Sequence, residues 1–255
     1  PQFYQLHLLY DTLAEGLETP VSIMTDLDLG MKDHVTEPLV WDDKREYKRG
    51  KVLSAEDLEK IGKFGRYLDV DGDGIPYRTI PATHPTKGSY FTRGTSRDEY
   101  AVYTEDSDSY KRNMDRLLKK WETAKGMVPE PQLYQKENKS KEAILFFGTS
   151  MYAAEEALDI LKEHSMPMDA MRIKSFPFSK TVEEFINSHE TVYVIEQNRD
   201  AQLKNMMLIE MGINPAKLVS VLNYDGTPIT AEGILRQISG KFASDSHIPK
   251  NVKLA

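Results

Sequence analysis

The chain has 255 residues, 40% of them hydrophobic, so it is long enough to bury a substantial core and to form two domains. Its net charge of -7 argues against a protein that binds nucleic acid, because such proteins usually carry a basic surface. It has no cysteine, which excludes disulfides, thiolate nucleophiles and any iron–sulfur cluster or zinc ion held by cysteines of this chain. The absence of cysteine and of a long apolar run predicts a cytoplasmic protein with no membrane span.

The first segment predicts a helix followed by a buried strand. Apolar residues recur at helical spacing over residues 3–13, and residues 20–25 have the composition of a buried strand. Asp26 and Asp28 follow directly, at a strand end where ligands collect in α/β proteins, which makes them candidates for contact with a ligand or another chain. The alternative is that they cap the turn at Gly30.

Regular patterns then lapse until about residue 107, and this long excursion contains two candidate sites. Asp69, Asp71, Asp73 and Gly74 match the opening of a calcium loop, in which alternating carboxylates converge on the ion. The match fails at the twelfth position, which is Ile80 instead of glutamate. The alternative interpretation is a hydrogen-bonded turn without a metal.

The second candidate is a polar stretch later in the same excursion. Thr92, Arg93, Thr95 and Arg97 supply two guanidinium groups and two hydroxyls, which suit a substrate carboxylate or phosphate. The alternative is that the run 97–99 forms an internal ion-pair network that holds the loop in place.

A helix with an apolar stripe over residues 110–124, preceded by Ser107 and Asp108 as its cap, ends this half of the chain. One strand and two helices do not close a sheet, so residues 1–126 predict an incomplete domain whose missing strands lie upstream or on another chain. The chain starts without methionine or a targeting pattern, which also favours a fragment of a longer protein. Residues 127–141 are polar and carry prolines, as is typical of an interdomain linker.

Residues 142–240 predict an α/β domain. Four apolar strands alternate with four amphipathic helices, a pattern that favours a parallel sheet covered on both faces. The first strand leads through the turn 148–150 into a helix, where backbone N–H groups offer a weak anion site; a plain turn is the alternative. Residues 241–255 are expected to form a tail.

Polar residues crowd the end of the third strand of this domain. Glu196, Asn198 and Arg199 are candidates for an interface, whereas a helix start capped by Asn198 or Asp200 is the alternative. The scattered histidines and the lack of a G-x-S-x-G elbow give no self-contained catalytic apparatus.

Several unrelated segments, in the same order along almost the whole chain, resemble the alpha subunit of 2-oxoglutarate:ferredoxin oxidoreductase. They are residues 19–31, 69–79, 87–94, 113–117, 176–178 and 196–203. The resemblance implies an α/β protein with the C-terminal part of a thiamine-diphosphate (pyrimidine) binding domain, followed by a transketolase C-terminal-like domain. Members of this family often have His-Asp-Glu where this chain has Arg97-Asp98-Glu99, so the resemblance assigns no role to Arg97.

The resemblance also implies an activity. Such enzymes decarboxylate a 2-oxoacid on thiamine diphosphate with Mg²⁺, pass electrons through a 4Fe-4S cluster to ferredoxin and form an acyl-coenzyme A, here succinyl-coenzyme A. The expected partners are the upstream part of the alpha subunit, a beta subunit and ferredoxin, in a hetero-oligomer that is inactive without them. The family's known catalytic residues lie upstream, so no catalytic residue is assigned here, and no cofactor is expected on this chain alone.

Two other hypotheses stay open from the sequence. One is a noncatalytic binding or assembly module whose Asp69–Gly74 loop holds a cation. The other is a related oxidoreductase that acts on pyruvate or a branched 2-oxoacid.

Overall fold

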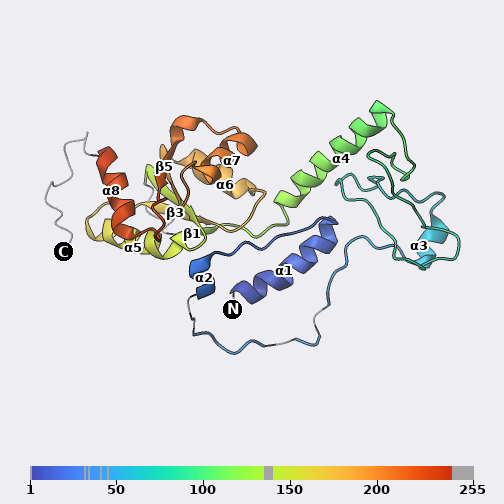
Figure 1. Cartoon of the computed structure of the whole chain (residues 1–255), viewed down its shortest axis with the longest axis horizontal. Coiled ribbons are helices and arrows are strands. Elements are labelled where there is room, and N and C mark those ends of the chain that lie inside the picture. Colours follow the sequence, from blue (N-terminus) through green and yellow to red (C-terminus); the bar gives the residue numbers. More distant parts are fainter. Residues whose placement is uncertain are drawn as a thin grey trace. The chain divides into compact units, whose positions relative to one another are not determined.

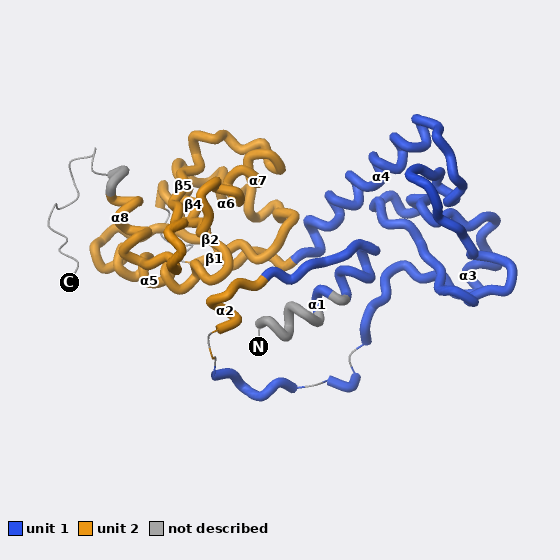
Figure 2. Tube along the Cα trace, in the orientation of Figure 1, with its two compact units in different colours: residues 1–24, 34–128 blue, residues 25–33, 129–255 orange. Residues whose placement is uncertain are grey.

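The computed structural model describes residues 2–31, 33, 35–40, 42–44, 46–134 and 140–242. The chain divides into two compact units, shown in different colours in Figure 2: unit 1 comprises residues 1–24 and 34–128, and unit 2 comprises residues 25–33 and 129–255. Part of the predicted linker, residues 135–139, and most of the predicted tail, residues 243–255, lie outside the described residues.

Unit 2 is built on a five-stranded sheet in the order β1-β3-β2-β4-β5. The strands β2, β3, β4 and β5 are parallel, and β1 pairs with β3 in the antiparallel sense. The elements in chain order are β1 (Gln132–Tyr134), β2 (Glu142–Phe147), α5 (Ser150–Glu163), β3 (Asp169–Ile173), α6 (Lys180–Ser188), β4 (Thr191–Glu196), α7 (Gln202–Met211), β5 (Leu218–Leu222) and α8 (Ala231–Phe242). The predicted parallel-sheet α/β fold class is confirmed.

Helices cover both faces of this sheet because its strands are apolar on both sides. Side chains alternate along each strand, so Ile144 and Phe146 face α5 and α8, whereas Leu145 faces α6 and α7 (Figure 1). The two resulting core layers contain Ile234 on one side and Met207 on the other, both fully buried. Because both faces of the sheet are buried, its strands are apolar at nearly every position, and this composition allowed them to be predicted from the sequence.

The edge strand β1 lies within the segment that we predicted to be a linker. Leu133 packs on the core layer next to α6 and α7, and the ring of Tyr134 lies 5.6 Å from that of Phe146 on the opposite layer. Three residues are too short a run for a clear periodic pattern, so only their packing identifies them as a strand.

Unit 1 contains the helices α1 (Gln2–Leu17), α3 (Ala55–Lys60) and α4 (Ser107–Lys125), joined by long coil segments. A small core of Leu13, Leu17, Ile75 and Ala124 holds α1 and α4 against the coil. The described residues of unit 1 form only isolated β-bridges, such as that between Val52 and Arg78, and no strand.

The strand predicted at residues 20–25 is wrong. These residues are coil, and Met24 is 87% exposed. A buried strand needs neighbouring strands for its backbone groups, and the described part of unit 1 supplies none. Residues 27–31 instead form the short helix α2 (Leu27–Met31), which belongs to unit 2.

None of the helices in the described part of the chain combines the length and apolar composition that a membrane crossing requires.

The packing of β1 generates a test of unit 2. We expect residues 129–242 and residues 141–242, expressed separately, both to unfold cooperatively in urea. The longer fragment should be more stable by about 2 kcal/mol, since it adds a buried leucine and an aromatic pair. Leu133→Ala in the longer fragment should remove most of this gain, and equal stability of the two fragments would show that β1 contributes nothing.

Candidate functional site

The predicted substrate-binding stretch has an exposed part and a part whose side chain is half-buried and hydrogen-bonded within unit 1. Thr92, Arg93 and Thr95 are exposed on the loop, whereas Arg97 is half-buried. The Arg97 guanidinium donates to the Tyr67 hydroxyl at 3.1 Å and to the Gly94 carbonyl at 2.9 Å. The structure therefore brings the Arg97 side chain to Tyr67 and to the backbone of Gly94.

The residues after Arg97 hold the loop to itself and to α4. The Asp98 carboxylate accepts from the backbone N–H groups of Tyr100 and Val102, both at 2.9 Å. Glu99 pairs with Arg112 of α4 at 2.5 Å, and Asn113 of the same helix donates to the Arg97 carbonyl at 2.8 Å. Only the Glu99–Arg112 contact is an ion pair and the others are hydrogen bonds, so the network that holds the loop contains one ion pair. The role of the stretch in binding a substrate stays a prediction.

Gly94 is required at its position in this loop. Its φ is +74°, in the left-handed region, and a Cβ there would lie 2.4 Å from the ring of Tyr103. The loop therefore has a defined path between the exposed candidates and Arg97.

Three guanidinium groups surround the ring of Tyr67. The Arg66 and Arg97 carbons both lie 5.5 Å from the ring centroid, and that of Arg116 lies 5.9 Å away. Lys120 follows Arg116 by one helical turn on α4, and Glu18 forms an ion pair with Arg66 at 2.7 Å. We call Glu18, Arg66, Tyr67, Arg97, Arg116 and Lys120 the Tyr67 cluster.

Burial and like charges perturb the cations of this cluster. Burial, followed by repulsion from Arg66, lowers the pKa of Arg116. Burial and the charge of Arg116 lower the pKa of Lys120. Burial is the largest single influence on the pKa of Arg66 and acts to lower it, but Glu18 and Tyr90 together outweigh burial and the net shift is upward.

Sequence reasoning missed Arg66, Arg116 and Lys120. One signal was available: Arg116 and Lys120 are four residues apart on a predicted helix, so they share a face. Nothing in the sequence indicated that Arg66, from the coil, would meet that face.

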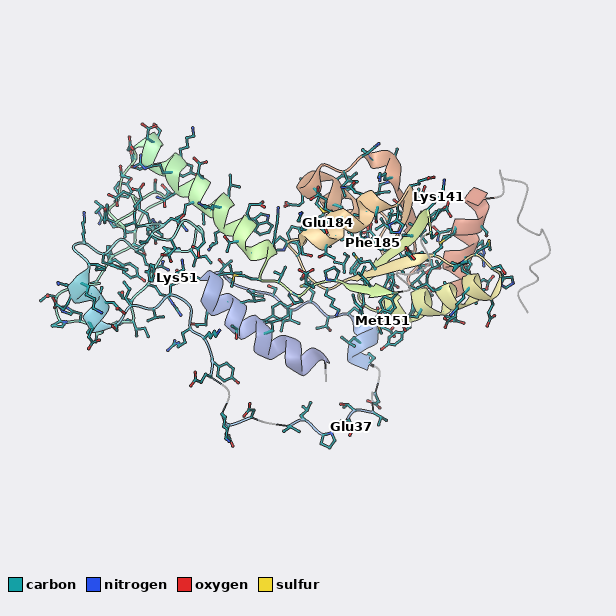
Figure 3. All side chains as sticks on the ribbon, turned by 180° about the vertical axis from the view of Figure 1, so that it is seen from behind. Glu37, Lys51, Lys141, Met151, Glu184 and Phe185 are labelled. Atoms are coloured by element: carbon teal, nitrogen blue, oxygen red, sulfur yellow. The ribbon has the colours of Figure 1, made fainter. Side chains whose placement is uncertain are left out.

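The predicted cation loop forms turns and an ion pair. Asp69 accepts from the N–H of Gly72, and Asp73 from the N–H of Ile75, both at 2.9 Å. The ammonium of Lys51, labelled in Figure 3, lies 2.7 Å from the Asp71 carboxylate and 2.8 Å from that of Asp73. Within the described residues, no group of three or more His, Cys, Asp or Glu has the arrangement of a metal site. The structure favours the hydrogen-bonded turn, with Lys51 as the cation.

Unit 1 also contains an open pocket of about 300 Å³ between α3 and the loop 87–89. Its apolar wall includes Leu58 and Phe64, and its cations are Lys63 and Lys87. The Lys63 ammonium lies 3.8 Å from the centroid of the Tyr100 ring. Lys87 pairs with Glu59 at 2.7 Å, so one of the two cations is already neutralised.

In unit 2, Asp26 caps α2 and also reaches the turn after β2. Its carboxylate accepts from the Leu29 N–H at 2.9 Å and from the Thr149 hydroxyl at 2.5 Å. A carboxylate of this chain therefore lies at the start of α5, where we considered an anion site. Asp28 is exposed.

Glu196 is fully buried, so the interface contact predicted for its side chain is wrong. Its carboxylate accepts from the backbone N–H groups of Leu203 and Lys204, at 2.7 and 3.0 Å, and from the Asn198 amide at 2.8 Å. Ala201, the residue before α7, has no capping side chain of its own. Glu196 supplies the missing cap from the end of β4, because orphan N–H groups at a buried helix start need an acceptor.

The neighbours of Glu196 are tied down locally. The Asn198 side chain accepts from the N–H groups of Asp200 and Gln202, as the capping alternative required. Arg199 is exposed and pairs with Asp200 at 2.8 Å. Gln197 donates to the Ser150 hydroxyl at 3.3 Å and accepts from the backbone N–H of Ile229 at 3.1 Å.

Comparisons with known proteins agree with the α/β fold. The chain resembles a solved structure of 2-oxoglutarate:ferredoxin oxidoreductase from Magnetococcus marinus, with a TM-score of 0.62, 20% identity, and coverage of 71% of this chain and 31% of that chain. The alpha chain of a probable 2-oxoacid ferredoxin oxidoreductase from Thermoplasma acidophilum gives a TM-score of 0.31, with 22% identity over 45% of this chain and 97% of that chain. That score is too low to support a shared fold.

In sequence, the chain is similar to the 2-oxoacid:ferredoxin oxidoreductase subunit alpha of Saccharolobus solfataricus. The two are 23% identical over 229 residues, which cover 87% of this chain and 34% of that protein. The chain therefore spans about a third of the length of the curated relative that it matches. No family model matches the chain.

The buried cap generates a mutational prediction. Glu196→Gln should lower the free energy of unfolding by about 2 kcal/mol, because an amide NH₂ replaces one of two oxygens that accept backbone N–H groups. Chemical denaturation of the full chain measures this. Glu190→Gln, at an exposed ion pair, is the matched control and should change stability by less than about 0.5 kcal/mol. An equally small effect at Glu196 would contradict its role as the cap.

The Lys51 ion pairs generate a pH prediction. Hydrogen bonding to Lys51 lowers the pKa of Asp71 below its ordinary value of 3.8. Burial acts to lower the pKa of Lys51, but the bonds of Lys51 to Asp71 and Asp73 together outweigh burial and raise this pKa above its ordinary value of 10.5. The Lys51 ion pairs should therefore contribute fully to stability between the ordinary pKa values of Asp71 and Lys51. The contribution should be lost when the pH falls through the lowered pKa of Asp71, and also when the pH rises through the raised pKa of Lys51.

Thermal unfolding as a function of pH measures this effect. Lys51→Met should flatten both limbs relative to the wild-type chain, whereas Lys119→Met, on the exposed side of α4, should not. Calcium should stabilise neither the wild-type chain nor Lys119→Met; a clear calcium-dependent rise in the wild-type chain that Asp71→Ala abolishes would restore the cation hypothesis.

Proposed function

We propose that this chain is part of the alpha subunit of a 2-oxoacid:ferredoxin oxidoreductase. The observation that carries the proposal is the sequence similarity over 229 residues to an alpha subunit of this enzyme class. The likeness of fold, with a TM-score of 0.62, supports it. We place the chain in the C-terminal part of such a subunit, with residues 1–126 completing a pyrimidine-binding domain, residues 127–141 as linker and residues 142–240 as a transketolase C-terminal-like domain.

The expected substrate is 2-oxoglutarate. The structure from Magnetococcus marinus is described with 2-oxoglutarate, coenzyme A and succinyl-coenzyme A bound, which supports the same substrates for the whole enzyme proposed here. Pyruvate or a branched 2-oxoacid is the alternative within the same class.

The 4Fe-4S cluster of this class does not fit the residues of this chain, because the chain has no cysteine and therefore no thiolate ligand. Within its described residues, no group of three or more His, Cys, Asp or Glu is arranged to hold a metal ion. We assign the cluster, and thiamine diphosphate with its Mg²⁺, to the upstream part of the alpha subunit and to the beta subunit. This chain's contribution is structural and subunit-contacting, in a cytoplasmic hetero-oligomer that reduces ferredoxin.

The exposed loop supplies the candidate contacts with substrate. Thr92, Arg93 and Thr95 carry unburied donors, so we propose that they form the rim of the substrate pocket in the assembled enzyme. Asp28 and Arg199, both exposed, are proposed interface residues. The side chains of Asn198 and Asp26 accept hydrogen bonds from the first turns of α7 and α2, so we propose that they act on an interface by holding these helix starts in place.

Purification of the tagged full chain with its natural partners tests the function. We expect a cysteine-bearing subunit to co-purify, and the complex to reduce ferredoxin only when both 2-oxoglutarate and coenzyme A are present. Recovery of the chain alone, or a complex that oxidises no 2-oxoacid, would refute the proposal. A preference for pyruvate would keep the class and change the substrate.

The rim residues have their own test in that complex. Arg93→Ala should raise the KM for the 2-oxoacid about tenfold with little change in kcat, because it removes one charge-assisted hydrogen bond. Lys111→Ala, an exposed cation on α4, is the control. An unchanged KM in Arg93→Ala would remove this residue from the pocket and leave the enzyme class standing.

A further inference from the structure

The half-buried charges around Tyr67 do not balance. Five half-buried cations lie in this part of unit 1 with the carboxylates of Glu15 and Glu18. The cations are Arg66, Arg78, Arg97, Arg116 and Lys120. Arg97 donates only to neutral groups, the Tyr67 hydroxyl and the Gly94 carbonyl. A half-buried cation that lacks an opposite charge is costly, so such an excess requires an explanation.

The two carboxylates form ion pairs with two of these cations, Arg66 and Arg78. Arg66 lies 2.7 Å from Glu18, whose side chain is only 5% exposed. Arg78 forms an ion pair with Glu15, and its Nε lies 3.8 Å from Glu18. Neither carboxylate forms an ion pair with Arg116 or Lys120.

Arg116 and Lys120 have only neutral partners. The Arg116 guanidinium donates to the Gly74 carbonyl at 2.9 Å, and the Lys120 ammonium donates to the Leu17 carbonyl at 3.0 Å and the Thr19 hydroxyl at 2.6 Å. No carboxylate of the described residues lies within ion-pair distance of either cation. Asp69 and Glu18 attract Arg116, and Glu18 attracts Lys120, only from beyond that distance.

Hydrogen-bond donors are also unused at this place. Arg66 Nη1, Arg78 Nε and Arg116 Nε are buried and have no acceptor in the described part of the chain, and both carboxylate oxygens of Glu18 are buried there without a hydrogen-bond donor. Buried guanidinium N–H groups without acceptors are uncommon, because each loses its bond to water without replacement. Only Arg116 combines an unmatched charge with an unmatched donor. Arg66 keeps an unmatched donor beside its ion pair with Glu18, and Lys120 has an unmatched charge but acceptors for its ammonium.

We propose that Arg66, Arg116 and Lys120 form a binding site for an oxyanion, the phosphate or carboxylate group of a small-molecule ligand. The guanidinium groups present paired N–H donors that match such a group, and Lys120 adds a point charge. The guanidinium carbons of Arg66 and Arg116 lie 5.5 and 5.9 Å from the centroid of the Tyr67 ring, so cation–π attraction keeps both groups near the ring. Neither arginine is fully buried, which leaves the anion a way in.

This inference does not rest on the proposed function, because the site is a property of unit 1 alone. It also differs from the rim formed by Thr92, Arg93 and Thr95, none of which stacks on Tyr67. Phosphate and carboxylate share the recognition chemistry, so both have to be offered as probes.

Calorimetric titration of the full chain with inorganic phosphate, and separately with succinate, at constant ionic strength tests the site. We expect saturable binding of one of the two at one site per chain, which identifies the ligand group as phosphate or carboxylate. Arg116→Met and Lys120→Met should each weaken this binding about tenfold or more. Lys119→Met, the neighbouring exposed cation on α4, should bind like the wild-type chain.

Circular dichroism identifies any variant that fails to fold. If either Arg116→Met or Lys120→Met does not fold, the binding measured for the other variant tests the proposal. Absence of saturable binding of both probes by the wild-type chain would overturn the proposal. Binding that Arg116→Met and Lys120→Met leave unchanged, or that Lys119→Met weakens as much, would overturn it as well. Activity of the assembled enzyme enters none of these outcomes, so the site and the proposed function fail separately.

Discussion

Backbone N–H and C=O groups must find partners wherever water is excluded, and the two units of this chain meet that requirement in different ways. In unit 2 the five-stranded sheet pairs the backbone, and the apolar strands then need helices on both faces. In unit 1 the described residues form no strand, so side chains do much of this work. Asp98, Asp69 and Asp73 each accept from the backbone of the loop that contains them.

This difference decides how much the sequence revealed. Sheet and helix patterns repeat along the chain, so the alternation over residues 142–240 was readable, down to the division between strands and helices. The same rules failed for residues 20–25, because an apolar run indicates a strand only if other strands lie beside it. They also passed over β1, whose role comes from Leu133 and its neighbours in space.

The polar sites show the same limit in their side chains. The crowding at the end of β4 was visible, and so was the need for a cap, but the residue that provides it was assigned to an interface. Glu196 caps α7 from a distance of seven residues along the chain, beyond the range of local capping patterns. Likewise, the Asp69–Gly74 pattern was real, but Lys51, which neutralises it, lies outside the motif. The partners of a charge are set by tertiary structure, which a linear pattern does not record.

Gln197 carries a consequence for the edge of the sheet where α/β proteins commonly bind ligands. The chain leaves β2 toward β3 on one side and later returns to β4 on the other, so the crevice between β2 and β4 is the place where a ligand would ordinarily insert. The Gln197 amide joins Ser150 after β2 to Ile229 before α8 across the ends of these strands. The side-chain amide of Gln197 thus ties the segment after β4 to the start of α5 and to the segment before α8, three parts of unit 2 that are far apart along the chain.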